Sequence, residues 1–285
     1  MRPVCLAFLL VCAGTAAAPG ESPSETTDFI RFVEGDSEDT LQTALVRYRR
    51  EDGVQVDLVG AVHVADLAYY EELNRRFSEY DAVLYEMVGG PHSGKSANEE
   101  TAAKNRLEWV AKLQDTLCRS LALESQLDCI HYGALNFVHA DLTAEAFQAS
   151  QKERKESFFG LWLKAMQAQQ ASVGGRPQPG LATLVRILLS GDSATEMKRL
   201  IGREFDNLEP LLAGVEAGGG TSIIGERNRH ALQVLESEVK SGHRHLAIFY
   251  GAAHLPDMET RLLAMGFRLV HIEYLSAWRL QDRKS

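Results

Sequence analysis

Two short motifs of the same form, a glycine followed three residues later by a histidine, stand 191 positions apart in this 285-residue chain. The first ends at His63 and the second at His254, and an aspartate follows each three residues on, Asp66 and Asp257. Glycine lets a strand end turn tightly or approach a ligand. Imidazole is a common metal ligand and a general base near neutral pH. The repetition favours one shared site over two separate packing histidines.

A glutamate inside an apolar run follows each motif, Glu86 after the first and Glu273 after the second. A carboxylate in a buried strand is costly unless it is paired or bound to a cation. Two imidazoles and one or two carboxylates suit a divalent ion such as Mn²⁺, Co²⁺ or Zn²⁺ with an open position for water. The predicted metal ligands are His63, Glu86 and His254, although the same set could perform general acid–base chemistry without metal.

Three polar residues open a predicted helix after a glycine-rich run. Arg227 and Asn228 are candidates to bind a substrate carboxylate or to stabilise an oxyanion, and Glu226 is a candidate substrate contact. The structural alternatives are a salt bridge, a helix cap and a first-turn dipole partner.

Two further candidates lie close together in an extended segment. His139 and Asp141 can contact substrate, supply a third imidazole or orient a neighbouring one. A core histidine and a helix-capping aspartate would explain the same pattern.

Alternating and helical apolar patterns place these residues on a sheet with helices. Strands are expected over 29–35, 41–51, 54–63, 81–88, 245–254 and 267–275, and helices over 66–80, 101–127, 226–240 and 255–266. We predict an α/β fold with a mixed central sheet flanked by helices, built from two related βαβ units with a helical insertion at about 101–220. The whole domain is expected to span 29–280.

The amino-terminal residues have the layout of a secretory signal peptide. Arg2 precedes an apolar run and a cluster of small residues, so we expect 1–18 to be removed and 19–28 to form a disordered mature terminus. The protein is therefore expected to be exported, periplasmic or secreted. In such a compartment Cys118 and Cys129 can form a disulfide or remain two buried thiols.

Charge and hydropathy exclude some partners. Without the leader, 29 basic residues stand against 39 acidic ones and no basic cluster is present, which argues against nucleic-acid binding. The apolar segment 181–191 is too short to span a bilayer and is expected to be a packed helix, with membrane contact or a lid role as the alternatives. The expected substrate is a peptide or small molecule.

These motifs together resemble the TraB/PrgY/GumN family, which includes the Tiki proteases. The resemblance rests on the two histidine motifs, on the tyrosine-to-glutamate run ending at Glu86 and on Glu226-Arg227-Asn228, and it extends from about Val54 to Tyr274. It implies a mixed α/β fold related to erythromycin esterases and haem-binding ChaN-like proteins, with the duplicated units forming the site. In the Tiki branch the paired motifs support metal-dependent peptide cleavage, and in the PrgY branch the role is to block or sequester a peptide.

The leading hypothesis from sequence is an exported metal-dependent hydrolase of peptide or amide bonds. His63, Glu86 and His254 would hold the ion, a carboxylate would take the proton of water, and Arg227 would stabilise the oxyanion. The alternatives are a protein that sequesters a peptide or haem-like ligand without turnover, and a metal-free esterase with His63 as base.

Overall fold

A computed structural model of the chain describes residues 27–88, 118, 121–143, 145–147, 149, 192–203 and 224–281. These residues form a seven-stranded mixed sheet, which confirms the predicted α/β class with helices flanking a central sheet. The strand order is β1-β2-β3-β8-β5-β7, and β9 pairs with the remaining edge of β2. A separate two-stranded ribbon joins β4 (Val64–Ala65) to β6 (Glu124–Ser125).

The antiparallel part of the sheet is built on one long strand, β2 (Glu38–Arg49). It pairs with β1 (Ile30–Val33) and β3 (Gln55–Ala61) along one edge and with β9 (Arg268–Gln281) along the other. The β2–β3 connection contains Gly53 at φ +87°, a conformation that favours glycine. The predicted hairpin is therefore present, and the last strand runs six residues beyond its expected end at residue 275.

The parallel part of the sheet contains the strands that end next to the two histidine motifs and Glu86. β8 (His245–Gly251) lies between β3 and β5 (Ala82–Tyr85), and β7 (Phe137–His139) completes this edge. Their interiors are almost wholly apolar, as expected for strands covered on both faces.

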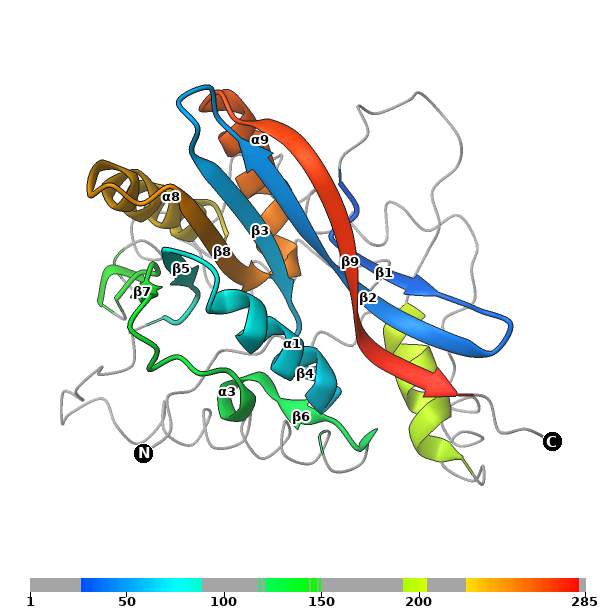
Figure 1. Cartoon of the computed structure of the whole chain (residues 1–285). Helices are drawn as coiled ribbons and strands as arrows, with labels where there is room; N and C mark the ends of the chain where they lie inside the picture. Colours follow the sequence, from blue (N-terminus) through cyan, green and yellow to red (C-terminus); the bar gives the residue numbers. More distant parts are fainter. Residues whose placement is uncertain are drawn as a thin grey trace, which may run out of the picture.

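Helices cover both faces of the sheet. Helix α1 (Leu67–Phe77) connects β3 to β5, whereas α9 (Leu255–Ala264) leads from β8 towards β9 in the opposite direction along the sheet. With the usual right-handed crossovers these two connections place their helices on opposite faces. Figure 1 shows α1 in front of the sheet and α9 behind β2 and β3, with α8 (Gly225–Lys240) also behind.

One predicted helix is interrupted. The segment 101–127 was expected to be helical throughout, but Ala122 adopts φ +49° and the Leu123 N–H donates to the Cys118 carbonyl. The chain then forms β6 and the short helix α3 (Gln126–Cys129). Pairing of β6 with β4 overrides the local helical pattern. Residues 101–117, 119 and 120 of that expectation lie outside the described residues.

The structure bears in part on two other expectations, the state of the two cysteines and membrane contact. No disulfide joins the two described cysteines, Cys118 and Cys129, and both side chains are partly buried. Within the part of the chain that the structure describes, no helix is long and apolar enough to cross a membrane. The predicted leader, the 181–191 segment and most of the 101–220 insertion lie outside that part.

Candidate functional site

The candidate residues converge where the direction of the chain connections changes. β3 and β8 are parallel neighbours whose following helices pack on opposite faces. Such switch points at the carboxyl ends of strands are the usual ligand sites of open α/β sheets. His63 lies two residues beyond β3, Glu86 directly follows β5, and the short helix η1 (Ala252–His254) follows β8.

Arg227 is the charged centre of this cluster. Its Nε and Nη2 donate to the two oxygens of Asp141 at 2.9 and 2.6 Å, and Nη2 also donates to Glu86 Oε1 at 2.7 Å. The Arg227 side chain is 8% exposed and that of Asp141 is fully buried. Burial lowers the pKa of Arg227, but the two carboxylates outweigh it and the net pKa is raised. The guanidinium is therefore charged, and Asp141 anchors it.

His254 is held as a neutral imidazole. Its Nδ1 lies 2.6 Å from Asn228 Oδ1, an acceptor, while the Asn228 amide nitrogen donates to the His254 carbonyl and to Asp257. The bond to Asn228 places the proton on Nδ1 and leaves the Nε2 lone pair towards Arg227 Nη1, 3.3 Å away. Burial lowers the pKa of His254 to about 4. The charge of Glu86 raises this pKa and the charge of Arg227 lowers it further, but burial has the largest effect.

These bonds change the expected role of Asn228. Both ends of its side-chain amide are occupied and the residue is fully buried. An oxyanion could not displace the His254 and Asp257 partners without breaking the cluster. Asn228 is therefore a positioning residue for His254.

Glu86 is ionised although it is largely buried. Burial raises its pKa, but Arg227, His254 and His63 lower it more strongly, and the net pKa lies well below 4.5. Its Oε2 accepts the Gly251 N–H at 2.8 Å. A Cβ on Gly251 would lie 3.3 Å from that oxygen, so the second motif needs glycine here for close approach.

The glycine of the first motif has a different role. Gly60 lies inside β3, and a Cβ there would meet the backbone carbonyls of Phe29 and Ala44 at 3.3 Å. The Tyr69 hydroxyl also donates to its carbonyl at 2.8 Å. The two glycines therefore match in sequence but serve sheet packing in one motif and the site in the other.

His63 is partly exposed and belongs to the same electrostatic cluster. Burial and Arg227 lower its pKa, whereas Glu86 and the side chain of Gln126 raise it, with a net lowering. The carbonyl of His63 accepts the Gln126 N–H at 3.0 Å. Both histidines act on the Glu86 charge, so the fold brings the two motifs to one carboxylate.

The guanidinium of Arg227 competes with a metal ion for two of the predicted ligands. His254 Nε2 and Glu86 Oε1 are 3.7 Å apart, close to the separation of about 3.4 Å between two ligands of one tetrahedral ion. Arg227, however, contacts both atoms through Nη1 and Nη2. Across the described ranges no three His, Cys, Asp or Glu side chains are placed to hold a metal ion. The predicted ligand set does not fit an ion while Arg227 keeps this position.

Two predicted substrate contacts have local partners. His139 Nε2 lies 2.6 Å from the Met87 carbonyl, and its ring packs edge-on against Tyr85. Glu226 forms an ion pair with Arg229 one turn along α8. Thr143 is the residue that caps the next turn, since its hydroxyl accepts the Ala146 N–H at 3.1 Å, while Asp141 accepts from Arg227.

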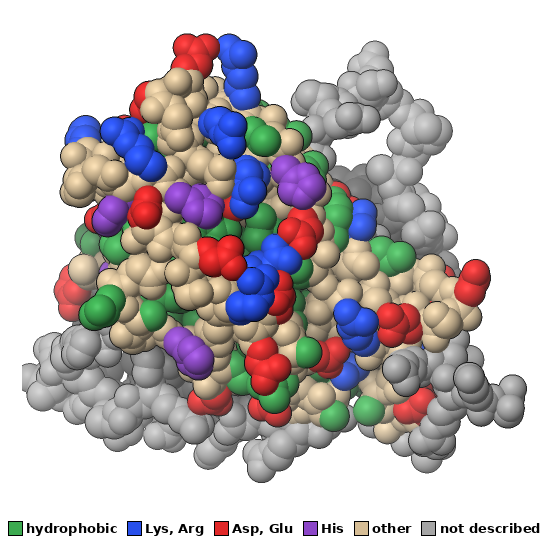
Figure 2. All heavy atoms as spheres, in the orientation of Figure 1, with side chains coloured by type: hydrophobic (Ala, Val, Ile, Leu, Met, Phe, Trp, Pro, Cys, Tyr) green, Lys and Arg blue, Asp and Glu red, His purple; other side chains and the backbone are tan. Residues whose placement is uncertain are grey.

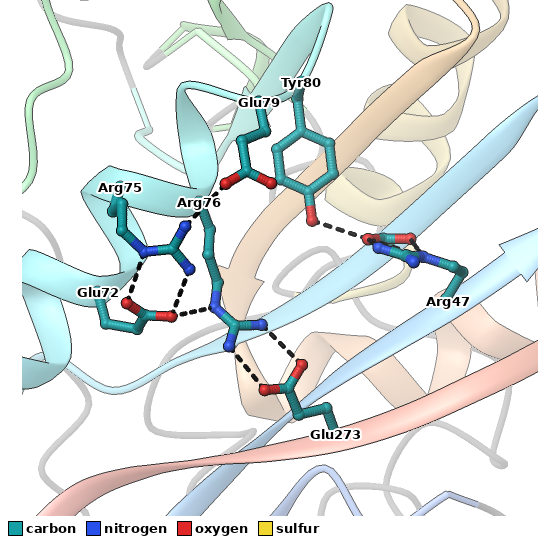
Figure 3. Close-up of polar contacts among 8 residues, drawn as sticks. Arg47, Glu72, Arg75, Arg76, Glu79, Tyr80 and Glu273 are labelled. Carbon is teal, nitrogen blue, oxygen red and sulfur yellow. Dashed lines mark hydrogen bonds and ion pairs between the residues drawn. The ribbon is translucent and has the colours of Figure 1, made fainter.

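Glu273 does not occupy a position equivalent to Glu86. It lies on β9, where Arg76 of α1 donates to both of its oxygens at 2.7 and 2.6 Å (Figure 3). The same network includes Glu72 and Arg75. Acidic and basic side chains are intermixed at the centre of this face of the molecule (Figure 2). Glu86 and Glu273 therefore hold corresponding positions in the sequence but not in the fold.

Tyr250 is a site residue that the motifs do not reveal. It is fully buried at the end of β8, its ring packs edge-on against His254, and its hydroxyl donates to the Ala140 carbonyl at 2.7 Å. Burial raises its pKa well above the ordinary value. The only signal in sequence is its place directly before the second motif.

No protein-family model, curated protein or solved structure matches this chain. The resemblance to TraB/PrgY/GumN proteins continues to rest on the ordered motifs alone. Function is therefore argued from the geometry of the cluster.

Proposed function

We propose that this protein is a hydrolase of peptide or amide bonds that activates water with a histidine base beside a buried arginine. The observation that carries the proposal is the Glu86–Arg227–His254 cluster at the switch point, with His63 at its partly exposed side. The three groups have distinct charge states: an ionised carboxylate, a charged guanidinium and a neutral imidazole.

His63 is the best candidate for the base. Its pKa is lowered, so it is neutral at pH 7, and it is more exposed than His254. Glu86 is a poor base because its pKa is held low, but its charge favours the imidazolium that forms when His63 takes a proton from water. The same imidazolium can then protonate the leaving amine.

Arg227 is the candidate for stabilising the developing charge. When water attacks the carbonyl carbon, the carbonyl oxygen becomes an oxyanion, and a fixed cation in a buried site stabilises it without reorganising. Asp141 and Glu86 hold the guanidinium in place, and Asn228 holds His254 beside it. The side chain of Glu86 is 18% exposed, which supports access from its side.

The test is turnover on a panel of fluorogenic peptides and chromogenic esters, with His63→Gln as the key variant and the exposed His271→Gln as the matched control. Loss of the base should lower kcat/KM by about 10² to 10⁴-fold. In the wild type kcat/KM should fall as pH drops through a pKa below 6.5. Activity that survives in His63→Gln contradicts the assignment. Peptides that are bound and protected without cleavage would support sequestration instead.

Metal-dependent hydrolysis, which the resemblance implies, is the second candidate. The 3.7 Å separation of His254 Nε2 and Glu86 Oε1 favours it, and Arg227 opposes it. Elemental analysis and chelator treatment separate the two: the histidine-base proposal expects undiminished turnover after chelation and no stoichiometric metal. Stoichiometric metal lost in His254→Ala would favour the metallohydrolase.

A further inference from the structure

Gln126 and His63 are neighbours in the fold, joined by a backbone hydrogen bond. The strand β4 that follows His63 pairs with β6, and Gln126 begins α3 immediately after β6. The Gln126 N–H donates to the His63 carbonyl at 3.0 Å. The ribbon therefore fixes the position of Gln126 relative to the first histidine.

Among the described residues, the side-chain amide of Gln126 has a hydrogen-bond partner for its nitrogen and none for its oxygen. The residue is 5% exposed, and its Nε2 donates to the Tyr132 hydroxyl at 2.8 Å. Its Oε1 is buried and accepts no hydrogen bond of ordinary geometry from the described residues. A buried oxygen left without a donor destabilises the fold, so its retention needs a reason.

The imidazole of His63, which the backbone bond holds next to Gln126, can donate a hydrogen bond to this oxygen. The Gln126 side chain raises the pKa of His63, as an acceptor facing an imidazole N–H does. Hydrogen bonds between catalytic groups are often long in the free enzyme and shorten in the complex.

We propose that Gln126 is the positioning residue of His63, and that its amide oxygen accepts one imidazole N–H so that the other nitrogen is free to act as base. The assignment rests on the buried amide oxygen of Gln126 and on the backbone bond that holds Gln126 next to His63, whereas its catalytic consequence rests on the proposed function.

The second histidine has a counterpart to this arrangement. Asn228 Oδ1 accepts the N–H of His254, so an amide oxygen serves each motif. An amide orients an imidazole without adding negative charge next to Glu86 and Asp141. A carboxylate in its place would stabilise the imidazolium and raise the pKa of the histidine.

The decisive measurement is the tautomer of His63 by long-range ¹H–¹⁵N correlation spectra of the imidazole ring, assigned with His63→Gln. In the wild type at pH 7.5 we expect one neutral tautomer. Gln126→Met removes the acceptor and should give a mixture of neutral tautomers. Gln126→Glu keeps an oxygen and should restore a single tautomer once the pH exceeds the His63 pKa that the new carboxylate raises. A single, unchanged tautomer in Gln126→Met overturns the inference.

Turnover provides the second readout, with Tyr132→Phe as the control for loss of the Tyr132 hydroxyl. Removal of an orienting partner typically costs 10 to 100-fold in activity, so Gln126→Met should lower kcat by about that factor with little change in KM. Thermal unfolding shows whether each variant is folded. If the protein has no hydrolytic activity, the proposed function fails while the spectra still decide the role of Gln126.

Discussion

The burial of Arg227 makes its removal a direct test of the site. We consider Arg227→Met, which keeps most of the aliphatic stem and removes the charge. Two carboxylates, Glu86 and Asp141, then lose their shared cation while the side chain of Asp141 remains fully buried. Breaking a buried ion pair by removing one partner costs about 3–5 kcal/mol. Because domains of this kind are stable by about 5–15 kcal/mol, the variant should fold but be clearly weakened.

The loss should also depend on pH with a definite sign. In the wild type the pKa of Glu86 is lowered, so its stabilising contribution is present above pH 4.5 and is lost only below it. Without Arg227, burial dominates and raises the pKa of Glu86. Protonation of Glu86 in the folded variant then relieves part of the loss as pH falls from 7.5 to 5. The difference in unfolding free energy between the two proteins should therefore shrink over this interval.

Urea denaturation followed by circular dichroism at pH 7.5 and pH 5 measures both effects. Arg75→Met is the matched control, because Arg75 is 58% exposed and its pairs with Glu72 and Glu79 should contribute at most about 1 kcal/mol. Combining Arg227→Met with Glu86→Gln should recover part of the loss, since one unpaired charge is removed. The reasoning is refuted if Arg227→Met is within about 1 kcal/mol of wild type, or if the loss is the same at both pH values.

Two further predictions concern the second motif. Gly251→Ala places a Cβ 3.3 Å from Glu86 Oε2, and the resulting shift of the carboxylate by a few tenths of an ångström should lower kcat about tenfold. Gly133→Ala is the control, because a Cβ at Gly133 meets open space and should have no effect on kcat. Equal kcat in the two variants would contradict the close approach. The buried His254, with a pKa of about 4 against 6.5 when unfolded, should reduce the unfolding free energy as pH falls below 6.5, by about 3 kcal/mol near pH 4. His254→Gln should lack that slope in urea titrations, and parallel curves for the two proteins would show that His254 is not buried in its neutral form.

Local patterns in the sequence were sufficient for much of the fold. Runs of apolar residues located β2, β3, β5 and β8, and helical spacing located α1. These patterns report burial directly, because each face of an element is buried or exposed as a whole. Local propensity failed at residues 122–125, where pairing of β6 with the distant β4 decided the conformation.

The motifs drew attention to residues that lie in one cluster, but not to their hydrogen-bond partners. Sequence reasoning offered Asp141 and Glu226 as substrate contacts without naming their partners, and in the fold Asp141 binds Arg227 and Glu226 pairs with Arg229. A hydrogen-bond partner is set by the direction of a side chain in space. That direction depends on strand register and helix rotation, which no local pattern contains.

The residue types and their order along the chain alone determined that two histidines, a glutamate and an arginine belong together, because buried polar groups in apolar runs need partners. Only the tertiary structure decided which partners they take. The parallel pairing of β3 with β8 brings the two motifs together, and α8 carries Arg227 to Glu86. The second glutamate lies instead on β9, on the far side of β2 from β3, because the two crossovers run in opposite directions along the sheet.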